Sequence, residues 1–281
     1  MAFATIAQRV PTFVTDVDVV RVTATVTDRS GRFITGLTKD DFRIFEDGHP
    51  RELLRVADES EPVSLGILFD ASGSMNPAKV RLARESVSHL VTHGLRDADE
   101  WFLARFGFSL VVVTDWTTDR DAVAQPLREI THTTGDTALY DAVGLSIPLM
   151  DMGRYEKKSL LVVSDGGETK SLLSLESLKR AIGENDVRVY AIGVDSADAR
   201  AGERLRMQTL RRIADETGGR TEAASDSSGA RAAADRIADE LRHQYLLTFS
   251  TSVAKDRRAH AIHVVVRQGA AVRARSSFVA D

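Results

Sequence analysis

The chain has 281 residues, of which 43% are hydrophobic and 28% charged, with a formal net charge of -4 and no cysteine. This composition predicts a soluble globular protein, and the small negative charge argues against a nucleic-acid-binding surface. The lack of cysteine excludes disulfides, iron-sulfur clusters and thiolate zinc sites, and no apolar stretch approaches the roughly 18 residues of a membrane span, so no membrane insertion is expected.

The N-terminal region begins with an ambiguous segment and continues as strands. Residues 1–8 have the small side chains found at the end of a secretory signal, but not its basic start or apolar middle, so a truncated export signal and a frayed terminus are both open. Alternating apolar residues predict a strand at residues 17–26. A second strand at 42–46 runs into Asp47-Gly48, a pair typical of hairpins. Residues 1–60 are therefore predicted to be a β-rich segment.

The middle of the chain changes to an alternation of strands and helices. Strands are predicted at residues 65–69, 101–106, 110–113, 160–164 and 187–194, and helices at 77–94, 119–130, 139–150, 175–183, 205–217 and 228–245. This alternation indicates an α/β fold in which a doubly wound, mostly parallel sheet is covered by helices on both faces. We assign residues 61–245 to this domain.

The C-terminal residues 246–281 return to the β pattern. Strands are predicted at residues 246–250, 262–267 and 271–278, with polar turns between them. Because both ends of the chain are β-rich, we expect them to pair in one small accessory β domain from which the α/β domain projects.

The segment at residues 63–75 carries the strongest functional signal. A buried strand ends at Asp70, and Ser72 and Ser74 follow at alternate positions around Gly73, which allows a tight turn. A carboxylate and two hydroxyls are hard oxygen donors, which suit magnesium or calcium better than zinc.

Two further loops supply candidate ligands. Thr137 lies just before a predicted helix, and Asp165 follows the buried strand at residues 160–164. In an open α/β sheet, ligands sit at the carboxyl ends of the strands, where these loops can converge. The simpler interpretation is that the two aspartates and the serines are turn and cap residues and that Thr137 is a helix N-cap. The sequence favours a site for Mg²⁺, with Mn²⁺ or Ca²⁺ as alternatives.

The three loops together resemble the metal-ion-dependent adhesion site of von Willebrand factor A domains. The resemblance covers about residues 60–245 and rests on Asp70-Ala71-Ser72-Gly73-Ser74, Thr137 in Gly-Asp-Thr and Asp165 in Ser-Asp-Gly. It implies a Rossmann-like fold in which Ser72, Ser74 and Thr137 offer hydroxyls, while Asp70 and Asp165 bind the metal directly or through water.

The opening of the chain resembles a bacterial group within this family. Residues 26–48 carry the similarity, and members of the group typically have export signals, which implies a periplasmic or extracellular location with an incomplete or removed signal; a cytoplasmic location is the alternative. The chain departs from its relatives at Gly167-Glu168-Thr169, where an acidic pair is common, so no role is carried over to Glu168. It also ends in Ser276-Ser277-Phe278, where relatives have Gly-Tyr or Gly-Phe.

Other conspicuous residues receive structural interpretations. His89 and His93 are four apart on a predicted helix, but no third ligand is placed beside them, so a solvated helix face is preferred to a zinc site. The arginines of residues 200–212 are balanced by acidic residues and indicate a solvated helix rather than an anion site. The aromatic residues expected in the core are Trp101, Phe102, Phe106 and Phe108.

These features predict a divalent-metal-dependent protein-binding module and not an enzyme. A partner's Glu or Asp would fill an open position on the metal, which neutral hydroxyl ligands leave electrophilic. In the family, ligation can couple to movement of the last helix, here residues 228–245. Two alternatives stay open: a metal-dependent hydrolase or phosphotransferase that uses Asp70 as nucleophile or metal ligand, and a structural module with a vestigial metal site.

Overall fold

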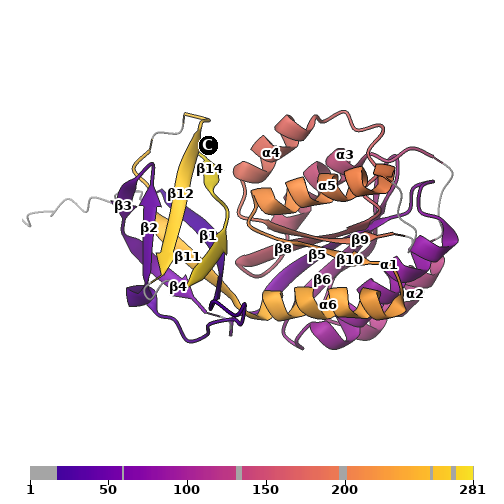
Figure 1. Cartoon of the computed structure of the whole chain (residues 1–281), viewed down its shortest axis with the longest axis horizontal. Coiled ribbons are helices and arrows are strands. Elements are labelled where there is room, and N and C mark those ends of the chain that lie inside the picture. Colours follow the sequence, from indigo (N-terminus) through magenta and orange to yellow (C-terminus); the bar gives the residue numbers. More distant parts are fainter. Residues whose placement is uncertain are drawn as a thin grey trace, which may run out of the picture.

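The computed structural model describes residues 18–58, 60–130, 135–195, 201–253, 256–266 and 270–280. The chain forms two lobes, one of strands and one of helices around a sheet (Figure 1). The ambiguous segment at residues 1–8 lies outside the described residues.

The larger lobe is built on a sheet to which the described residues contribute six strands, in the order β10-β9-β8-β5-β6-β7. Neighbouring strands are parallel except β6 and β7, which are antiparallel. The bounds are Val63–Asp70 for β5, Glu100–Phe106 for β6, Leu110–Thr117 for β7, Lys157–Ser164 for β8, Arg188–Val194 for β9 and Thr221–Ala224 for β10. The predicted fold class, a doubly wound α/β sheet, is confirmed.

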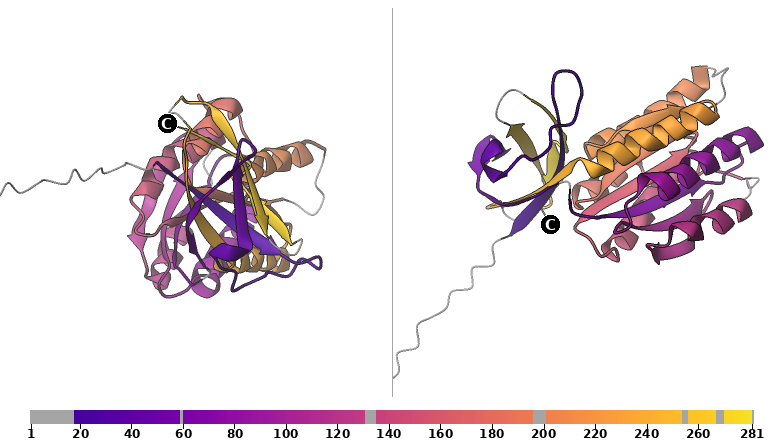
Figure 2. Two further views of the ribbon diagram at one scale, coloured as in Figure 1. Left: turned by 90° about the vertical axis from the view of Figure 1, so that its left-hand side faces the viewer. Right: turned by 90° about the horizontal axis from the view of Figure 1, so that it is seen from below.

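Helices cover both faces of this sheet (Figures 1 and 2). One face carries α1, α2 and α6, and the other carries α3, α4 and α5. The helices are α1 (Pro77–His89), α2 (Ala124–Glu129), α3 (Leu139–Asp151), α4 (Leu175–Gly183), α5 (Ala201–Glu216) and α6 (Ser227–Arg242). The first helix continues as a π-helical turn to Gly94, and α2 is preceded by a 3₁₀ turn.

Strand β5 shows why strands in the middle of the chain are continuous apolar runs rather than alternating ones. All eight of its residues are buried, because Ile67 and Phe69 pack in the core under α1 and α6 while Leu68 faces the other core. At Gly66 a Cβ would lie 2.7 Å from the sulfur of Met150. The glycine therefore allows α3 to pack directly on the central strand.

The smaller lobe consists of two packed β-sheets, each with four strands among the described residues, in the orders β13-β1-β11-β4 and β14-β12-β2-β3. Its strands are β1 (Val19–Thr27), β2 (Phe42–Glu46), β3 (His49–Arg51), β4 (Leu53–Ala57), β11 (Gln244–Ser250), β12 (Ala259–Val266), β13 (Ala271–Ala274) and β14 (Ser277–Val279). β1 pairs with β11 and β13, and β2 pairs with β12, so both sheets combine strands from the two ends of the sequence. Asp47 and Gly48 have positive φ at the β2–β3 turn, as a hairpin of this type requires.

Two predicted elements need correction, and one further strand was missed. The last helix ends at Arg242, and Tyr245 belongs to β11, where residues 245, 247 and 249 alternate into the β core. The single strand expected at residues 271–278 is two strands, because β13 pairs with β1 in one sheet and β14 with β12 in the other. The short strand β10 follows α5 and was not predicted.

The lobes meet at the amino ends of the central strands. β4 leads into the start of β5, and Arg188 at the start of β9 donates to the Thr25 hydroxyl of β1 at 2.9 Å. Arg188 and Glu240 are buried here, with side chains 1% and 0% exposed and 3.9 Å apart. Glu240 also accepts a hydrogen bond from the Tyr190 hydroxyl at 3.0 Å and pairs with Arg273. A satisfied network of buried charges therefore joins the lobes.

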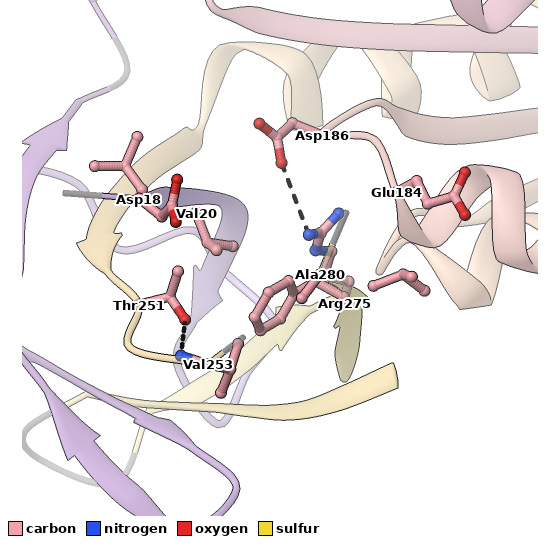
Figure 3. Close-up of a pocket in the computed structure, with 11 residues that line it drawn as sticks. Asp18, Val20, Glu184, Asp186, Thr251, Val253, Arg275 and Ala280 are labelled. Carbon is pink, nitrogen blue, oxygen red and sulfur yellow. Dashed lines mark hydrogen bonds and ion pairs between the residues drawn. The ribbon is translucent and has the colours of Figure 1, made fainter. Parts of the chain in front are cut away.

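A hollow of about 220 Å³ lies at the same junction (Figure 3). Figure 3 shows Arg275 pointing toward Asp186, and the two side chains are 3.7 Å apart. Arg275 also donates to the backbone carbonyl of Asn185. These contacts attach β13 and β14 of the small lobe to the loop before β9.

None of the helices in the described part of the chain combines the length and the apolar character of a membrane span.

Candidate functional site

The loop after β5 is folded by its own hydrogen bonds. The carboxylate of Asp70 accepts from the Ser72 backbone N–H at 2.9 Å, and the Met75 N–H donates to the carbonyl of Ser72 at 3.1 Å. Asn76 then caps α1 by accepting from the N–H groups of residues 78 and 79, both at 3.0 Å, and Pro77 occupies the first helical position. The strand end and the helix start therefore fix the backbone that carries Ser72 and Ser74.

The loop after β8 lies beside it. Ser164, the last residue of β8, donates its hydroxyl to Asp70 and accepts from the Gly166 N–H at 2.9 Å. Gly166 has φ +78°, and a Cβ there would lie 2.2 Å from the backbone oxygen of Arg206, so only glycine fits between this loop and α5. Asp165 is thereby held at the edge of the sheet next to Asp70.

The third loop carries Thr137. The Gly73 N–H donates to the carbonyl of Gly135 at 3.0 Å, which joins this loop to the first one. Thr137 is not the cap of α3: the N-cap residue is Ala138, which makes no side-chain cap bond. Glu168 accepts instead from the Tyr140 N–H in the first turn at 3.0 Å. The helix-cap interpretation of Thr137 is wrong, and Glu168 has the structural role.

The side-chain oxygens of the three loops converge. The hydroxyls of Ser72 and Ser74 are 3.2 Å apart, and Ser74 donates to Oδ1 of Asp165 at 3.0 Å. A Cβ placed on Gly167 would lie 3.1 Å from Asp165 Oδ1, 3.3 Å from Ser74 Oγ and 3.6 Å from Thr137 Oγ1. Side-chain oxygens from all three loops therefore lie close together beside Gly167, where a Cβ would crowd them.

The two aspartates differ in their electrostatic surroundings. Burial raises the pKa of Asp70 to about 6, since its hydrogen bonds from Ser72 and Ser164 offset only part of the desolvation. Burial also acts on Asp165, but hydrogen bonds from Lys79, Gly167 and Ser74 and the charge of Lys79 outweigh it and lower the pKa. No described residue forms an ion pair with Asp70. Its negative charge is therefore the uncompensated one.

Two cations beside Asp165 were missed by the sequence analysis. Lys79 Nζ lies 2.8 Å from Asp165 Oδ2 with its side chain only 6% exposed, and Arg206 Nη1 lies 3.1 Å from the same oxygen with its side chain 43% exposed. Arg206 comes from the arginine-rich stretch that was predicted to be a solvated helix. The only sequence signal for Lys79 is its place in the first turn of α1, directly after the capped loop.

A shallow hollow of about 350 Å³ opens over the converging oxygens. Its lining combines the loops with the start of α3 and with α5: Ser74, Thr137, Tyr140, Gly166, Gly167, Glu168, Thr169, Arg206 and Thr209.

Phe108, predicted to be in the core, is 71% exposed at the β6–β7 turn, where the adjacent Gly107 carbonyl accepts from the Ala138 N–H at 2.8 Å. The predicted core positions Trp101, Phe102 and Phe106 are buried.

The donor set fits a hard cation rather than zinc. Among the described residues there is no group of three or more His, Cys, Asp or Glu side chains that could hold a metal, so a cation would depend on hydroxyls together with Asp70 and Asp165. His89 and His93 stack on each other at the other end of α1, and His89 contacts Asp235 at 2.7 Å. The five predicted ligands are thus near one another, and the histidines are elsewhere.

Comparisons with known proteins agree with this architecture. The solved structures with the same fold include the conserved hypothetical protein BatB from Bacteroides thetaiotaomicron (20% identity, 63% of this chain and 98% of that one, TM-score 0.53). They also include an aerotolerance-related membrane protein from Bacteroides fragilis (20% identity, 64% of this chain and 98% of that one, TM-score 0.51). A third is a von Willebrand factor type A protein from Catenulispora acidiphila (14% identity, 96% of this chain and 74% of that one, TM-score 0.53). None of the curated proteins matches.

The sequence match is more specific than these structural likenesses, which at such identities show the fold alone. The family model of the von Willebrand factor type A domain matches residues 65–236, which is more than half of the chain and includes all three loops. The chain belongs to the von Willebrand factor type A domain family.

Proposed function

We propose that the chain is a divalent-metal-dependent protein-binding module that recognises a Glu or Asp of its partner at the edge where the three loops meet. The observation that carries this proposal is the convergence of side-chain oxygens from the three loops: atoms of Asp165, Ser74 and Thr137 lie 3.1 to 3.6 Å from the position that a Cβ of Gly167 would take. The buried Asp70, which has only uncharged hydrogen-bond donors, supports it, because a cation nearby would offset the cost of burying that charge.

Five residues of the chain would hold the cation. Ser72, Ser74 and Thr137 offer neutral oxygens, and Asp70 and Asp165 supply negative charge from the ends of β5 and β8. A divalent cation held there, Mg²⁺ by preference or Mn²⁺ or Ca²⁺, provides an open coordination position for an incoming carboxylate. The hollow beside the oxygens gives a partner's side chain access from solvent.

We propose binding rather than catalysis because the acid and base groups beside the site already have structural partners. Lys79 is paired with Asp165, and both carboxylate oxygens of Glu168 accept backbone N–H groups, Oε2 that of Tyr140 at the start of α3 and Oε1 that of Lys170. A hydrolase would need one of them free to exchange a proton with a substrate or water.

A thermal unfolding experiment tests the metal part of the proposal. Mg²⁺ at a hundred times its dissociation constant should stabilise the native chain by about 2.7 kcal/mol, because it binds the folded state only. Asp70→Ala should abolish this increase in Tm. Asp97→Ala removes an acidic side chain that is 100% exposed and serves as the control, with an unchanged response.

A pull-down from an envelope fraction tests the binding part. A partner that is captured in Mg²⁺ by the native chain, but not in EDTA and not by Asp70→Ala, is the expected result. Capture of the same partner under all three conditions would place the interaction surface elsewhere.

A further inference from the structure

The carboxylate of Asp165 is divided between two environments. Oδ1 accepts from the Ser74 hydroxyl and the Gly167 N–H, both at 3.0 Å, and so faces the converging oxygens. Oδ2 faces the other way and contacts Lys79 at 2.8 Å and Arg206 at 3.1 Å. One aspartate therefore belongs both to the candidate metal site and to an ion cluster beside it.

The position of Lys79 is fixed by the cap at the start of α1 and by the burial of its side chain. Its backbone N–H donates to the Asn76 side chain at 3.0 Å, in the cap that begins α1 directly after the loop of Ser72 and Ser74. Its side chain is 6% exposed and that of Asp165 is 2% exposed. A buried pair of this kind interacts strongly because little water screens it, whereas the half-exposed Arg206 is screened.

The formal charges of the two predicted carboxylate ligands and of the two neighbouring cations sum to zero, although both cations contact Asp165 and neither contacts Asp70. Asp70 and Asp165 carry two negative charges, and Lys79 and Arg206 carry two positive ones. A divalent cation that enters this cluster adds two positive charges close to a buried ammonium, and their repulsion opposes binding. A carboxylate that arrives with the cation removes part of that excess.

We infer that Lys79 is an internal counter-ion of Asp165 that keeps the affinity for a divalent cation low until a carboxylate is bound, so that cation and carboxylate bind cooperatively. This inference rests on the proposed function, and it assigns Lys79 a positioning role, since the lysine acts through Asp165. Because coupling between two ligands is reciprocal, the partner's acid would likewise bind weakly without the cation.

Titration of the full-length chain with Mn²⁺, with free Mn²⁺ followed by electron paramagnetic resonance, tests the inference. Lys79→Gln keeps a hydrogen-bond donor, on a side chain one bond shorter, but removes the charge, and it should tighten Mn²⁺ binding by at least about tenfold. Arg206→Gln removes the half-exposed cation and should tighten binding by about two- to threefold. Lys79→Arg keeps the charge and should bind as weakly as the native chain.

Lys157→Gln is the matched control. Lys157 is as buried as Lys79, at 1% exposure, but it lies at the amino end of β8, about 25 Å from Asp165 at the spacing of strand residues. Its replacement should leave the Mn²⁺ affinity unchanged. Acetate, the simplest carboxylate, should tighten Mn²⁺ binding to the native chain more than to Lys79→Gln.

The outcomes separate this inference from the proposed function. Equal Mn²⁺ affinity of the native chain, Lys79→Gln and Arg206→Gln would overturn the inference and leave the metal site standing. Mn²⁺ binding by Lys79→Gln and Arg206→Gln alone would support the inference in its strongest form. If none of these proteins binds Mn²⁺, both proposals are wrong. Should Lys79→Gln fail to fold, Arg206→Gln, on the surface of α5, still shows whether removing a positive charge beside Asp165 tightens Mn²⁺ binding.

Discussion

Charged groups are buried at both ends of the central sheet, but only those at the amino end have partners of opposite charge on every side. At the amino end, Glu240 is surrounded by Arg188, Arg220 and Arg273 and accepts from the Tyr190 hydroxyl. At the carboxyl end, Asp70 is equally buried but has only neutral donors.

The difference indicates what each end is for. A buried charge with partners on every side holds elements in one arrangement, and at the amino end it joins β1, β9, β13 and α6. A buried charge without a cation costs stability and is retained where a ligand supplies the missing charge. We therefore interpret the amino end as a joint between the lobes and the carboxyl end as the binding edge.

The largest effect is expected at the joint. Glu240→Gln would leave Arg188 buried without a carboxylate, and we expect the free energy of unfolding to fall by about 3 to 5 kcal/mol in urea denaturation. Glu216→Gln breaks the partly exposed pair with Lys179 and should cost at most about 1 kcal/mol. Similar losses in the two variants would remove the basis for calling the amino end a joint.

At the carboxyl end, the buried Asp70 should make stability depend on pH. Because the pKa of Asp70 is raised to about 6 from 3.8, the folded state binds more protons than the unfolded state between these values, and stability falls as pH rises through 6. In EDTA, the native chain should lose about 2 kcal/mol from this group between pH 4 and pH 7. Asp70→Asn cannot ionise, so urea denaturation should show this component missing. An identical pH profile for the two proteins would contradict the assignment.

The smallest effect on stability is expected from single hydroxyls. Thr137→Ala should lower the free energy of unfolding by about 1 kcal/mol or less, yet weaken Mg²⁺-dependent partner binding by at least about tenfold, because its hydroxyl faces the converging oxygens. Thr25→Val, at the joint, removes the hydroxyl between Arg188 and Glu240 and should reduce stability by about 1 to 3 kcal/mol with Mg²⁺ binding unchanged. Full-strength Mg²⁺-dependent binding by Thr137→Ala would remove this residue from the site.

Much of the fold was predictable because strands and helices produce recognisable patterns in the local order of residues. The buried run at residues 63–70 and the helix that Pro77 begins are visible in the order of the residues alone. The same order places Asp70 at the end of one strand and Asp165 directly after another, and parallel strands bring their carboxyl ends to one edge. That these residues bind a metal stays a prediction.

Only the tertiary structure decided which charges meet. Lys79 and Asp165 are 86 positions apart, and Arg206 and Asp165 are 41 apart, so no local pattern relates them. In the sequence, Arg206 looked like one of many solvated arginines and Phe108 like a core aromatic, because periodicity reports which face of an element is apolar but not what packs against it. The sequence by itself determined most of the elements and indicated five oxygen-bearing residues as candidate ligands. The folded chain decided that one aspartate is compensated by a buried lysine while the other is not, because the pairing of charges depends on distances that only packing sets.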